Sequence, residues 1–374
     1  MTSLTAGQES STREIRFPCS HCGALLSYAP GTKTLHCDYC GGDTPIDDQE
    51  TAPEAIQELP FRQALQQLAT ATPGRTVFTV QCENCAAEFT LDTNNHAGNC
   101  PFCGTPIVVK PGKSRPILPK SLVPFAITRR QAEESFASWL SSLWFAPGKL
   151  KKYGRTKDRL TGVYIPYWTY DSDTETDYTG ERGITYQVPT TVVVTENGRR
   201  VRRTVMVTKV RWTPVSGRVS RFFDDVLVGA STTLPRTITD RLRPWNLKAL
   251  VPFNEAYLSG FESEVYQVRL DDGFNRAVRI MDAIIRGDIA RDIGGDLQRI
   301  HHLDTRHDNI TYKHILLPIW SSAFTFADKT YRFVVNGQTG KVQGERPYSP
   351  WKITAAVIAA LAVIGGIALL KTNM

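Results

Sequence analysis

The segments Cys19-Ser-His-Cys22 and Cys37-Asp-Tyr-Cys40 form a C-x2-C-x14-C-x2-C frame, and Cys82-Glu-Asn-Cys85 and Cys100-Pro-Phe-Cys103 repeat that frame 63 residues later. Each C-x-x-C pair places two thiolates on one tight turn. Two such turns joined by a short hairpin offer four sulfur atoms, the ligand set that Zn2+ prefers. The sequence therefore predicts two structural zinc ribbons, and the ligands are all eight cysteines of the chain.

No cysteine lies outside the two frames, so the sequence offers no candidate disulfide framework. This usage fits a reducing compartment, where thiolates remain available for metal. The first 17 residues contain no apolar run, which predicts neither a secretory signal nor an N-terminal anchor. We therefore expect cytoplasmic ribbons. Iron held by four thiolates and used for redox work is the alternative metal, and it would give a coloured protein.

The net charge of +7 hides two halves of opposite sign. Residues 1–112 contain 6 Lys and Arg against 12 Asp and Glu, whereas the remainder contains 38 against 25. Thiolates bound to zinc make the ribbon half more acidic still. A phosphate-backbone binder needs a basic surface, so the charge disfavours nucleic acid as a ligand of the ribbons.

The predicted fold class is α+β, with two four-cysteine zinc ribbons, a mixed body with antiparallel hairpins and one C-terminal transmembrane helix. Composition at 41% hydrophobic and 22% charged is ordinary for a globular protein of two or three domains. The predicted segments are a flexible N-terminus (1–16), zinc ribbon 1 (17–50), a linker helix (51–76), zinc ribbon 2 (77–110), the body (115–350) and the transmembrane helix (353–370).

Within the linker, helical spacing of apolar residues predicts a helix over 52–70. In the body, Thr128 is the expected N-cap of a helix that ends near Trp144. A later helix is expected to begin at Asp271 or Asp272 and to end near Gly294. A strand-like run over 264–270 precedes it.

Strands are expected over 163–170, 190–195 and 200–210, with Glu196-Asn-Gly198 as the hairpin turn between the last two. Some motifs occur twice in the body: Val-Pro-Phe at 123–125 and 251–253, and Pro-x-Trp at 166–168 and 318–320. A duplicated body would explain this repetition. Prolines at strand starts and buried tryptophans are also common separately, so both interpretations stay open.

Residues 353–370 form a run of 18 without a charge, flanked by Trp351, Lys352 and Lys371. At a rise of ~1.5 Å per residue the run is about 27 Å long, close to the thickness of a hydrocarbon core. Trp and Lys are the usual residues at the membrane interface. The sequence thus predicts a tail-anchored protein, single-pass in the inner membrane with its bulk in the cytoplasm. Small residues four apart, such as Ala355 and Ala359, would permit self-association.

Catalytic signatures are not recognisable. The acidic residues Asp171, Asp173, Glu175 and Asp177 alternate along an extended stretch without the glycine of a Ca2+ loop, so we expect a solvated strand face. His301, His302, His307 and His314 lack the spacing of a zinc enzyme and are expected in a polar loop. His21, His36 and His96 lie near sites that already have four sulfurs. With every cysteine committed to metal, no thiol nucleophile remains, and we expect no enzyme.

Basic residues crowd the predicted hairpin, at Arg199, Arg200, Arg202, Arg203, Lys209 and Arg211. Three interpretations compete for them: a solvated face, a nucleic-acid surface and a patch on anionic lipid. A tether close to a negatively charged leaflet raises the effective concentration of lipid. Tethering therefore favours lipid or solvent over nucleic acid.

From the first knuckle to the tail, the chain resembles a bacterial family of membrane-anchored double zinc-ribbon proteins. Besides the cysteine frames, the resemblance rests on Val123-Pro-Phe125, Trp144-Phe-Ala-Pro147, Ile165-Pro-Tyr-Trp168, Trp212-Thr-Pro-Val-Ser-Gly217, Leu317-Pro-Ile-Trp320 and Val335-Asn-Gly-Gln-Thr-Gly340.

Members of this family are often labelled primosomal replication-restart helicases, since that helicase also has paired four-cysteine knuckles. The label does not suit this chain, which has no nucleotide-binding loop and no room for two motor domains. Some relatives are encoded beside phage-shock-type and flotillin-like membrane-stress proteins, so the resemblance implies a recruiting role at the membrane. The expected function is a zinc-ribbon adaptor, and the alternative is a membrane-tethered nucleic-acid binder that uses the arginine-rich hairpin.

Overall fold

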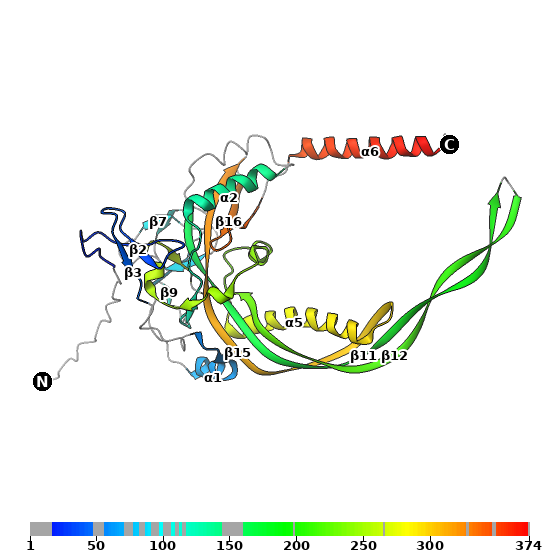
Figure 1. Ribbon diagram of the computed structural model, residues 1–374, viewed down its shortest axis with the longest axis horizontal. Coiled ribbons are helices and arrows are strands. Elements are labelled where there is room, and N and C mark those ends of the chain that lie inside the picture. The colour runs from blue at the N-terminus through cyan, green and yellow to red at the C-terminus, as the bar shows by residue number, and fades with distance from the viewer. Residues whose placement is uncertain are drawn as a thin grey trace.

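The protein is described from a computed structural model, which confirms a mixed α+β fold with antiparallel sheets (Figure 1). The described residues are 17–47, 56–70, 78–81, 87–90, 97–99, 106–108, 112–113, 117–143, 160–196, 199–264, 266–326, 329–345 and 349–372. The predicted flexible segment 1–16 lies outside them. The helices are α1 (Phe61–Thr70), α2 (Arg129–Ser142), α4 (Arg236–Thr239), α5 (Leu270–Ile293) and α6 (Pro350–Thr372), with short 3-10 turns η2 (Asp240–Leu242), η3 (Leu247–Ala249) and η4 (Glu255–Leu258).

A nine-stranded sheet forms the centre of the body. Its strands are β4 (Leu59–Pro60), β10 (Ser121–Leu122), β11 (Thr161–Glu196), β12 (Arg199–Gly229), β13 (Val251–Pro252), β14 (Glu262–Ser263), β15 (Leu297–Phe326), β16 (Lys329–Asn336) and β17 (Val342–Gly344). The order along its main path is β12-β11-β15-β10-β13. The three long strands β11, β12 and β15 make up most of this sheet.

The predicted hairpin is confirmed in place and is far longer than expected. Strands β11 and β12 stay antiparallel from Glu196 opposite Arg199 to Tyr167 opposite Gly229, with one register shift near Tyr170. Threonine and valine recur through both strands and tyrosine through β11, and these residues suit extended backbone. The outer end of the hairpin extends far beyond the rest of the sheet, on the side of the body where α6 also projects (Figure 1).

The prediction of a polar loop around the four histidines is wrong. His301, His302, His307 and His314 all lie on β15, which pairs with β11 from Thr161 opposite Ser321 to Gly183 opposite Leu297. The strand is polar because much of its outer half faces solvent, where charged side chains cost nothing. Backbone pairing with β11 makes it a strand.

Helix α5 lies across the sheet and buries one side chain per turn (Figure 1). From Gly273 onward its buried residues recur every four positions, as expected for one helix face. The buried residues are Leu270, Gly273, Ala277, Met281, Ile285, Ile289 and Ile293. A Cβ atom at Gly273 would lie 2.3 Å from the Tyr170 hydroxyl, so only glycine allows the helix this close. The helix ends at Gly294 with φ +66°, as predicted.

Helix α2 begins as predicted, and α1 does not. Thr128 accepts a hydrogen bond from the Gln131 backbone N–H, and the Gln131 side chain accepts from the Thr128 N–H, which completes a capping box. The linker helix was expected from residue 52 but begins at Phe61. Leu59–Pro60 instead pairs with β15, because proline disfavours the helical conformation in the residue before it.

The two Pro-x-Trp motifs lie side by side at the centre of the sheet. Strands β11 and β15 pair antiparallel there, with Ile165 opposite Leu317, Pro166 opposite Leu316 and Pro318 opposite Tyr164. These pairs are symmetric about Ile165 and Leu317. A local twofold axis therefore relates the two motifs.

Contacts around this axis also correspond. The Trp168 indole N–H donates to the Val268 carbonyl, two residues before α5, and the Trp320 indole N–H donates to the Ile127 carbonyl, two residues before α2. The carbonyl of Pro166 accepts from an N–H just after β12, and the carbonyl of Pro318 accepts from one just after β16. Each tryptophan thus fixes the helix of the other half. Duplication remains a prediction, and these contacts support it.

Helix α6 covers the predicted transmembrane segment and carries exposed apolar side chains. Over the described residues, whose side chains in this helix end at Gly365, none of the helices is long and apolar enough to cross a membrane. The predicted span over 353–370 is therefore not supported by the structure, and it stays a prediction.

Candidate metal centre

Ribbon 1 is a small three-stranded sheet with one cysteine pair before its first strand and the other between its second and third strands. Strands β1 (Ser27–Tyr28), β2 (Thr34–His36) and β3 (Asp43–Pro45) pair antiparallel in that order. Gly23 and Gly41 follow the two C-x-x-C turns, with φ +75° and +74°. Glycine adopts this left-handed conformation without a Cβ penalty, so both turns can close around the sulfur atoms.

The four cysteines of ribbon 1 converge as predicted. Cys19 Sγ lies 3.6 Å from Cys40 Sγ, and Cys22 Sγ lies 3.5 Å from Cys37 Sγ. All four sulfur atoms lie within 4.8 Å of one another, and the thiols are free. A tetrahedron with Zn–S bonds of ~2.3 Å has edges of about 3.8 Å. The geometry fits one zinc ion, which would hold the two turns together.

Backbone N–H groups favour thiolates at two of these cysteines. The N–H groups of His21 and Cys22 lower the pKa of Cys19 to about 6, and those of Cys40 and Tyr39 lower the pKa of Cys37. Cys19 and Cys37 are therefore the first to lose their protons.

The other two thiols ionise later. The Ala24 N–H lowers the pKa of Cys22, but burial and the neighbouring sulfur atoms outweigh it and raise that pKa to about 12. The Gly42 N–H likewise lowers the pKa of Cys40, but the sulfur atoms of Cys37 and Cys19 outweigh it, so that pKa is raised. Four thiolates in one place repel each other, so a bound cation is needed to ionise all four.

The nearby histidines are not needed as ligands. His36 Nδ1 lies 2.7 Å from Asp43 Oδ1, and His21 Nδ1 lies 3.3 Å from Ser20 Oγ. Both rings have polar partners of their own. His96 lies outside the described residues.

Ribbon 1 is attached firmly to the body by its inner face. The Tyr28 N–H donates to the Ser259 carbonyl (2.9 Å), and the Gly31 N–H donates to the Phe125 carbonyl (2.8 Å). The Tyr28 ring lies 5.1 Å from the ring of Tyr257. Buried Leu26 and Tyr28 belong to the same apolar cluster as body residues such as Phe125 and Trp320. The core of the ribbon is therefore continuous with part of the body core.

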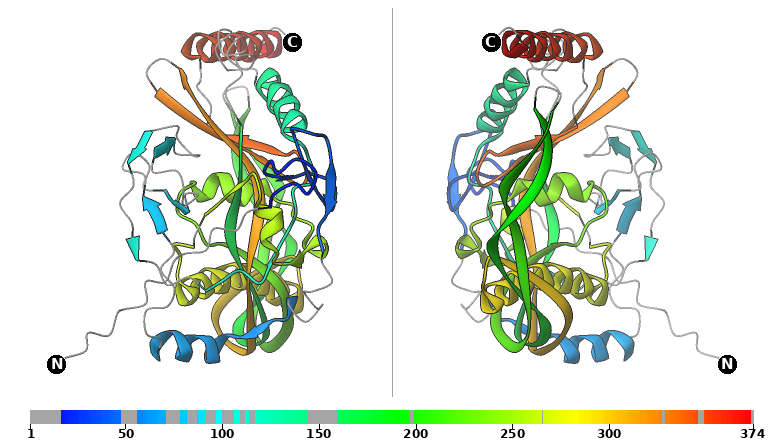
Figure 2. Two further views of the ribbon diagram at one scale, coloured as in Figure 1. Left: turned by 90° about the vertical axis from the view of Figure 1, so that its left-hand side faces the viewer. Right: turned by 90° about the vertical axis from the view of Figure 1, so that its right-hand side faces the viewer.

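Ribbon 2 repeats the hairpin of ribbon 1. Strands β7 (Ala97–Asn99) and β8 (Pro106–Val108) stand 63 residues after β2 and β3 and keep their register. Strands β5 (Phe78–Gln81), β6 (Glu88–Thr90) and β9 (Gly112–Lys113) form a second small sheet. Its predicted ligands Cys82, Cys85, Cys100 and Cys103 lie outside the described residues. The two ribbons lie on opposite sides of the central sheet (Figure 2).

A buried ion cluster in the body was missed by the sequence analysis. Asp171 is buried, although Asp173 and Asp177 on the same strand are exposed as predicted. A bulge in β11 at this point turns Asp171 inward, where it accepts from the Asp225 N–H (2.5 Å) and the Thr311 hydroxyl (2.9 Å). The alternation of acidic residues gave no sign of this difference.

Lys313 supplies a positive charge to this cluster. Its ammonium lies 2.8 Å from Asp225 Oδ1 and 3.3 Å from Glu58 Oε1, and only 8% of the side chain is exposed. Oxygen atoms of Glu58, Asp171 and Asp224 lie close enough together to ligate a cation. An ammonium already supplies the positive charge there. Burial raises the pKa of Asp171 to about 6, and the carboxyl of Glu58 beside it adds to the increase.

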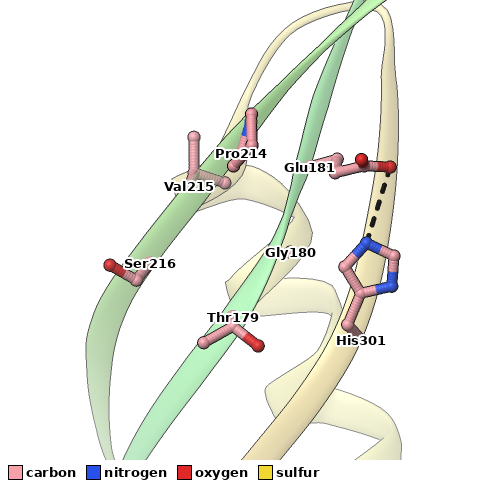
Figure 3. Close-up of a pocket in the computed structure, with 7 residues that line it drawn as sticks. All are labelled: Thr179, Gly180, Glu181, Pro214, Val215, Ser216 and His301. Carbon is pink, nitrogen blue, oxygen red and sulfur yellow. Dashed lines mark ion pairs between the residues drawn. The ribbon is translucent and has the colours of Figure 1, made fainter.

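The histidines of β15 do not form a metal site with the described residues. His314 is buried and bonded to the Ile117 carbonyl (2.6 Å), and burial lowers its pKa to about 4. His307 lies 3.5 Å from Ser172 Oγ. His301 Nε2 lies 3.5 Å from Glu181 Oε2, in a shallow groove of about 450 Å3 (Figure 3).

This groove runs along the sheet at the base of the extended hairpin. The bulge in register between Thr179 and Gly180 opens it, and a Cβ at Gly180 would lie 2.3 Å from the Arg299 carbonyl. In Figure 3 the side chains of Glu181 and His301 point toward one another, while the Ser216 hydroxyl points away. The lining residues provide the pair Glu181 and His301, together with the hydroxyls of Thr179 and Ser216.

Comparison with known proteins gives one relative. The chain is similar to the uncharacterized protein YdjG of Bacillus subtilis (strain 168), with 27% identity over 246 residues that cover 64% of this chain and 67% of the relative. No protein-family model matches the chain, and no solved structure does. The name of the relative states no activity, so the function must be argued from the site.

The cysteine geometry predicts the metal content of the protein. We expect about two zinc ions per chain, and about one after Cys19→Ser with Cys37→Ser, because two thiolates cannot hold the ion that four hold. Hydrogen exchange should then increase in the ribbon and around Ser259, where the ribbon is attached. His36→Ala is the control and should keep all the zinc. A colourless protein whose zinc content is unchanged by the cysteine substitutions would contradict the site.

Asp171 predicts a pH dependence of stability. A folded-state pKa of about 6, above the ordinary value of 3.8 for aspartate, adds stability that is complete below pH ~3.8 and is lost as the pH rises through ~6. Between pH 5 and 7.5 the free energy of unfolding should therefore fall by about 1 kcal/mol more in the wild type than in Asp171→Asn. Urea unfolding in one detergent measures this difference, with exposed Asp173→Asn as the control. Equal slopes for wild type and Asp171→Asn would contradict the assignment.

Proposed function

We propose that the protein is a non-enzymatic adaptor, tail-anchored in the bacterial inner membrane, whose zinc ribbons bind protein partners on the cytoplasmic side. One observation carries the proposal. Ribbon 1 uses its inner face to attach to the body and leaves its outer face open, with Cys22 and Cys40 of the metal site exposed there.

The outer face also exposes two large apolar side chains. Tyr39 lies inside the second C-x-x-C turn and is 84% exposed, and Leu25 follows the first turn and is 61% exposed. An aromatic side chain on a rigid, metal-held turn costs little entropy when it binds, which is typical of the residues that dominate protein interfaces. The acidic charge of the ribbon half favours a partner with a basic rim. By resemblance, membrane-stress or flotillin-like proteins are the partners to test first.

Helix α6 supports the membrane part of the proposal. Apolar side chains are exposed along its described part, at Val357, Ile358, Leu361, Val363 and Ile364. Water is a poor environment for such a surface, whereas a hydrocarbon core buries it on every side. Trp351 at its start is exposed, as an interfacial anchor would be before insertion.

The second candidate function is a membrane-tethered nucleic-acid binder. The observation that favours it is the exposed cluster of arginines on the outer part of β12. Such binding would weaken steeply with salt and with neutralisation of Arg200, Arg202 and Arg203. Absence of any shift of DNA or RNA at low salt would exclude it.

The outer face of ribbon 1 gives a prediction for partner binding. In full-length protein, Leu25→Ser with Tyr39→Ser should abolish the capture of crosslinked partners from membranes, because both apolar anchors are lost, while the zinc content stays unchanged. Leu118→Ser, at an exposed position outside the ribbons, is the control. Capture that survives the double substitution would contradict binding by this face.

Charges in α6 test the anchor. Val357→Arg with Ile364→Arg should release the protein from the membrane fraction, since each arginine costs roughly 2.5–3.5 kcal/mol at the centre of a membrane helix. Thr372→Arg, near the end of the helix, should leave it membrane-bound. Sodium carbonate extraction of all three proteins measures the effect. A wild-type protein that fractionates entirely with the soluble proteins would refute the anchor.

A further inference from the structure

The outer hairpin is a two-stranded arm without a third strand. Pairing of β15 with β11 ends at Gly183, opposite Leu297, while β11 and β12 continue to Glu196 opposite Arg199. We call residues 184–211 the arm. At about 3.3 Å per residue, the 13 residues of β11 beyond Gly183 reach ~43 Å from the sheet (Figure 1). No other described element pairs with the strands of the arm there.

The two faces of the arm differ in composition. Side chains of opposed residues point to the same face, so the register assigns each residue to one side. One side, the valine face, carries Val188, Val192, Val194, Val201, Val205 and Val207. The opposite face has fewer apolar residues. Its polar members include Thr185, Gln187, Thr191, Thr195, Thr204 and Thr208, and its apolar members are Pro189, Val193, Met206 and Val210, of which Val193 and Met206 are 60% and 61% exposed.

The valine face is open to solvent. Val201, Val205 and Val207 are 40%, 38% and 37% exposed, although they neighbour one another on one strand. A two-stranded ribbon has no core of its own and is only marginally stable in water. A contiguous apolar face on such a ribbon indicates a surface that something else covers.

Charge restricts what can cover it. The arm contains six Lys and Arg against one Glu. The register places Arg199, Arg203, Lys209 and Arg211 on the valine face itself, at its two ends and in its middle. The partner must therefore offer an apolar surface and negative charge together. A membrane rich in anionic lipid does so, with phosphates above the acyl chains.

Two other occupants fit less well. A second arm would bring like charges together, and a face of ~43 by ~10 Å covers about 430 Å2, roughly half of the ~800 Å2 per partner in a stable interface. Nucleic acid would pair with the arginines but would leave the valines against polar phosphate and base edges. The exposed valines favour lipid over both.

We propose that the arm lies on the surface of an anionic bilayer through its valine face, with the valines at the boundary of the acyl chains and the basic side chains on lipid phosphates. The inference does not require α6 to cross the membrane, because it concerns only the arm. It adds a second membrane contact to the proposed adaptor, far from the C-terminal helix along the chain.

Hydrogen exchange of the full-length protein tests the arm directly. On vesicles of phosphatidylcholine with 30% phosphatidylglycerol, exchange in residues 184–211 should slow by about 10-fold at lipid concentrations near ten times the dissociation constant. On phosphatidylcholine alone it should remain unchanged. Exchange is read peptide by peptide, so insertion of α6 into either vesicle does not affect the result.

Matched variants separate the two faces. Arg199→Gln with Lys209→Gln on the valine face should weaken arm binding by about 10- to 30-fold. Arg200→Gln with Arg202→Gln removes the same charge from the opposite face and should cost about 3-fold or less, because that face lies about one Debye length further away. Val201→Thr with Val205→Thr keeps β-branched residues in the strand and should also weaken binding.

Three outcomes would overturn the proposal. Equal losses of binding from the two double charge substitutions would mean that charge alone attracts the arm to the bilayer, without one face turned toward it. Slower exchange that appears with a DNA or RNA duplex, and not with anionic vesicles, would assign the arm to nucleic acid. Slower exchange that depends on protein concentration without vesicles would assign it to a second copy. Failure of α6 to anchor the protein would leave the vesicle result intact.

Discussion

Antiparallel pairing of β11 with β15 around Ile165 and Leu317 positions every other part of the body. Each strand brings a proline and a tryptophan to this point. The prolines cannot donate to the ladder, yet their carbonyls accept from the chain that leaves each hairpin. The tryptophans reach across to the start of the opposite helix. One symmetric pairing therefore fixes two hairpins and two helices, and the ribbons lie on either side of it.

Features that depend on neighbouring residues were predictable from the sequence. The C-x-x-C turns of ribbon 1 and the cap at Thr128 need only local chemistry, and the structure has them where expected. A local turn signal also predicted the hairpin, whose strands pair as far as Glu196 opposite Arg199. Apolar spacing likewise predicted α5. Four of the eight predicted ligands, Cys19, Cys22, Cys37 and Cys40, come together in a cluster that could hold a zinc ion, and the other four lie outside the described residues.

Features that depend on distant pairing were not predictable. Strand β15 has a polar outer half, so no alternation distinguishes it from a loop, and only its partner β11 makes it a strand. Asp171 is buried because a bulge turns it toward Lys313, which lies more than a hundred residues away. Nothing in the neighbouring sequence distinguishes this buried aspartate from the exposed acidic residues beside it. The length of the arm could not be predicted for the same reason.

Ribbon 1 makes backbone hydrogen bonds to two distant segments of the body, and both bonds come from the inner side of its small sheet. Gly31 bonds to Phe125 of the first Val-Pro-Phe segment, and Tyr28 bonds to Ser259, which follows the second such segment. A small module with a four-cysteine cluster therefore acts as a clasp between parts of the chain that lie more than a hundred residues apart. If one zinc ion holds the four sulfur atoms, its loss or oxidation of the thiolates would loosen contacts in the body far from the ribbon along the chain.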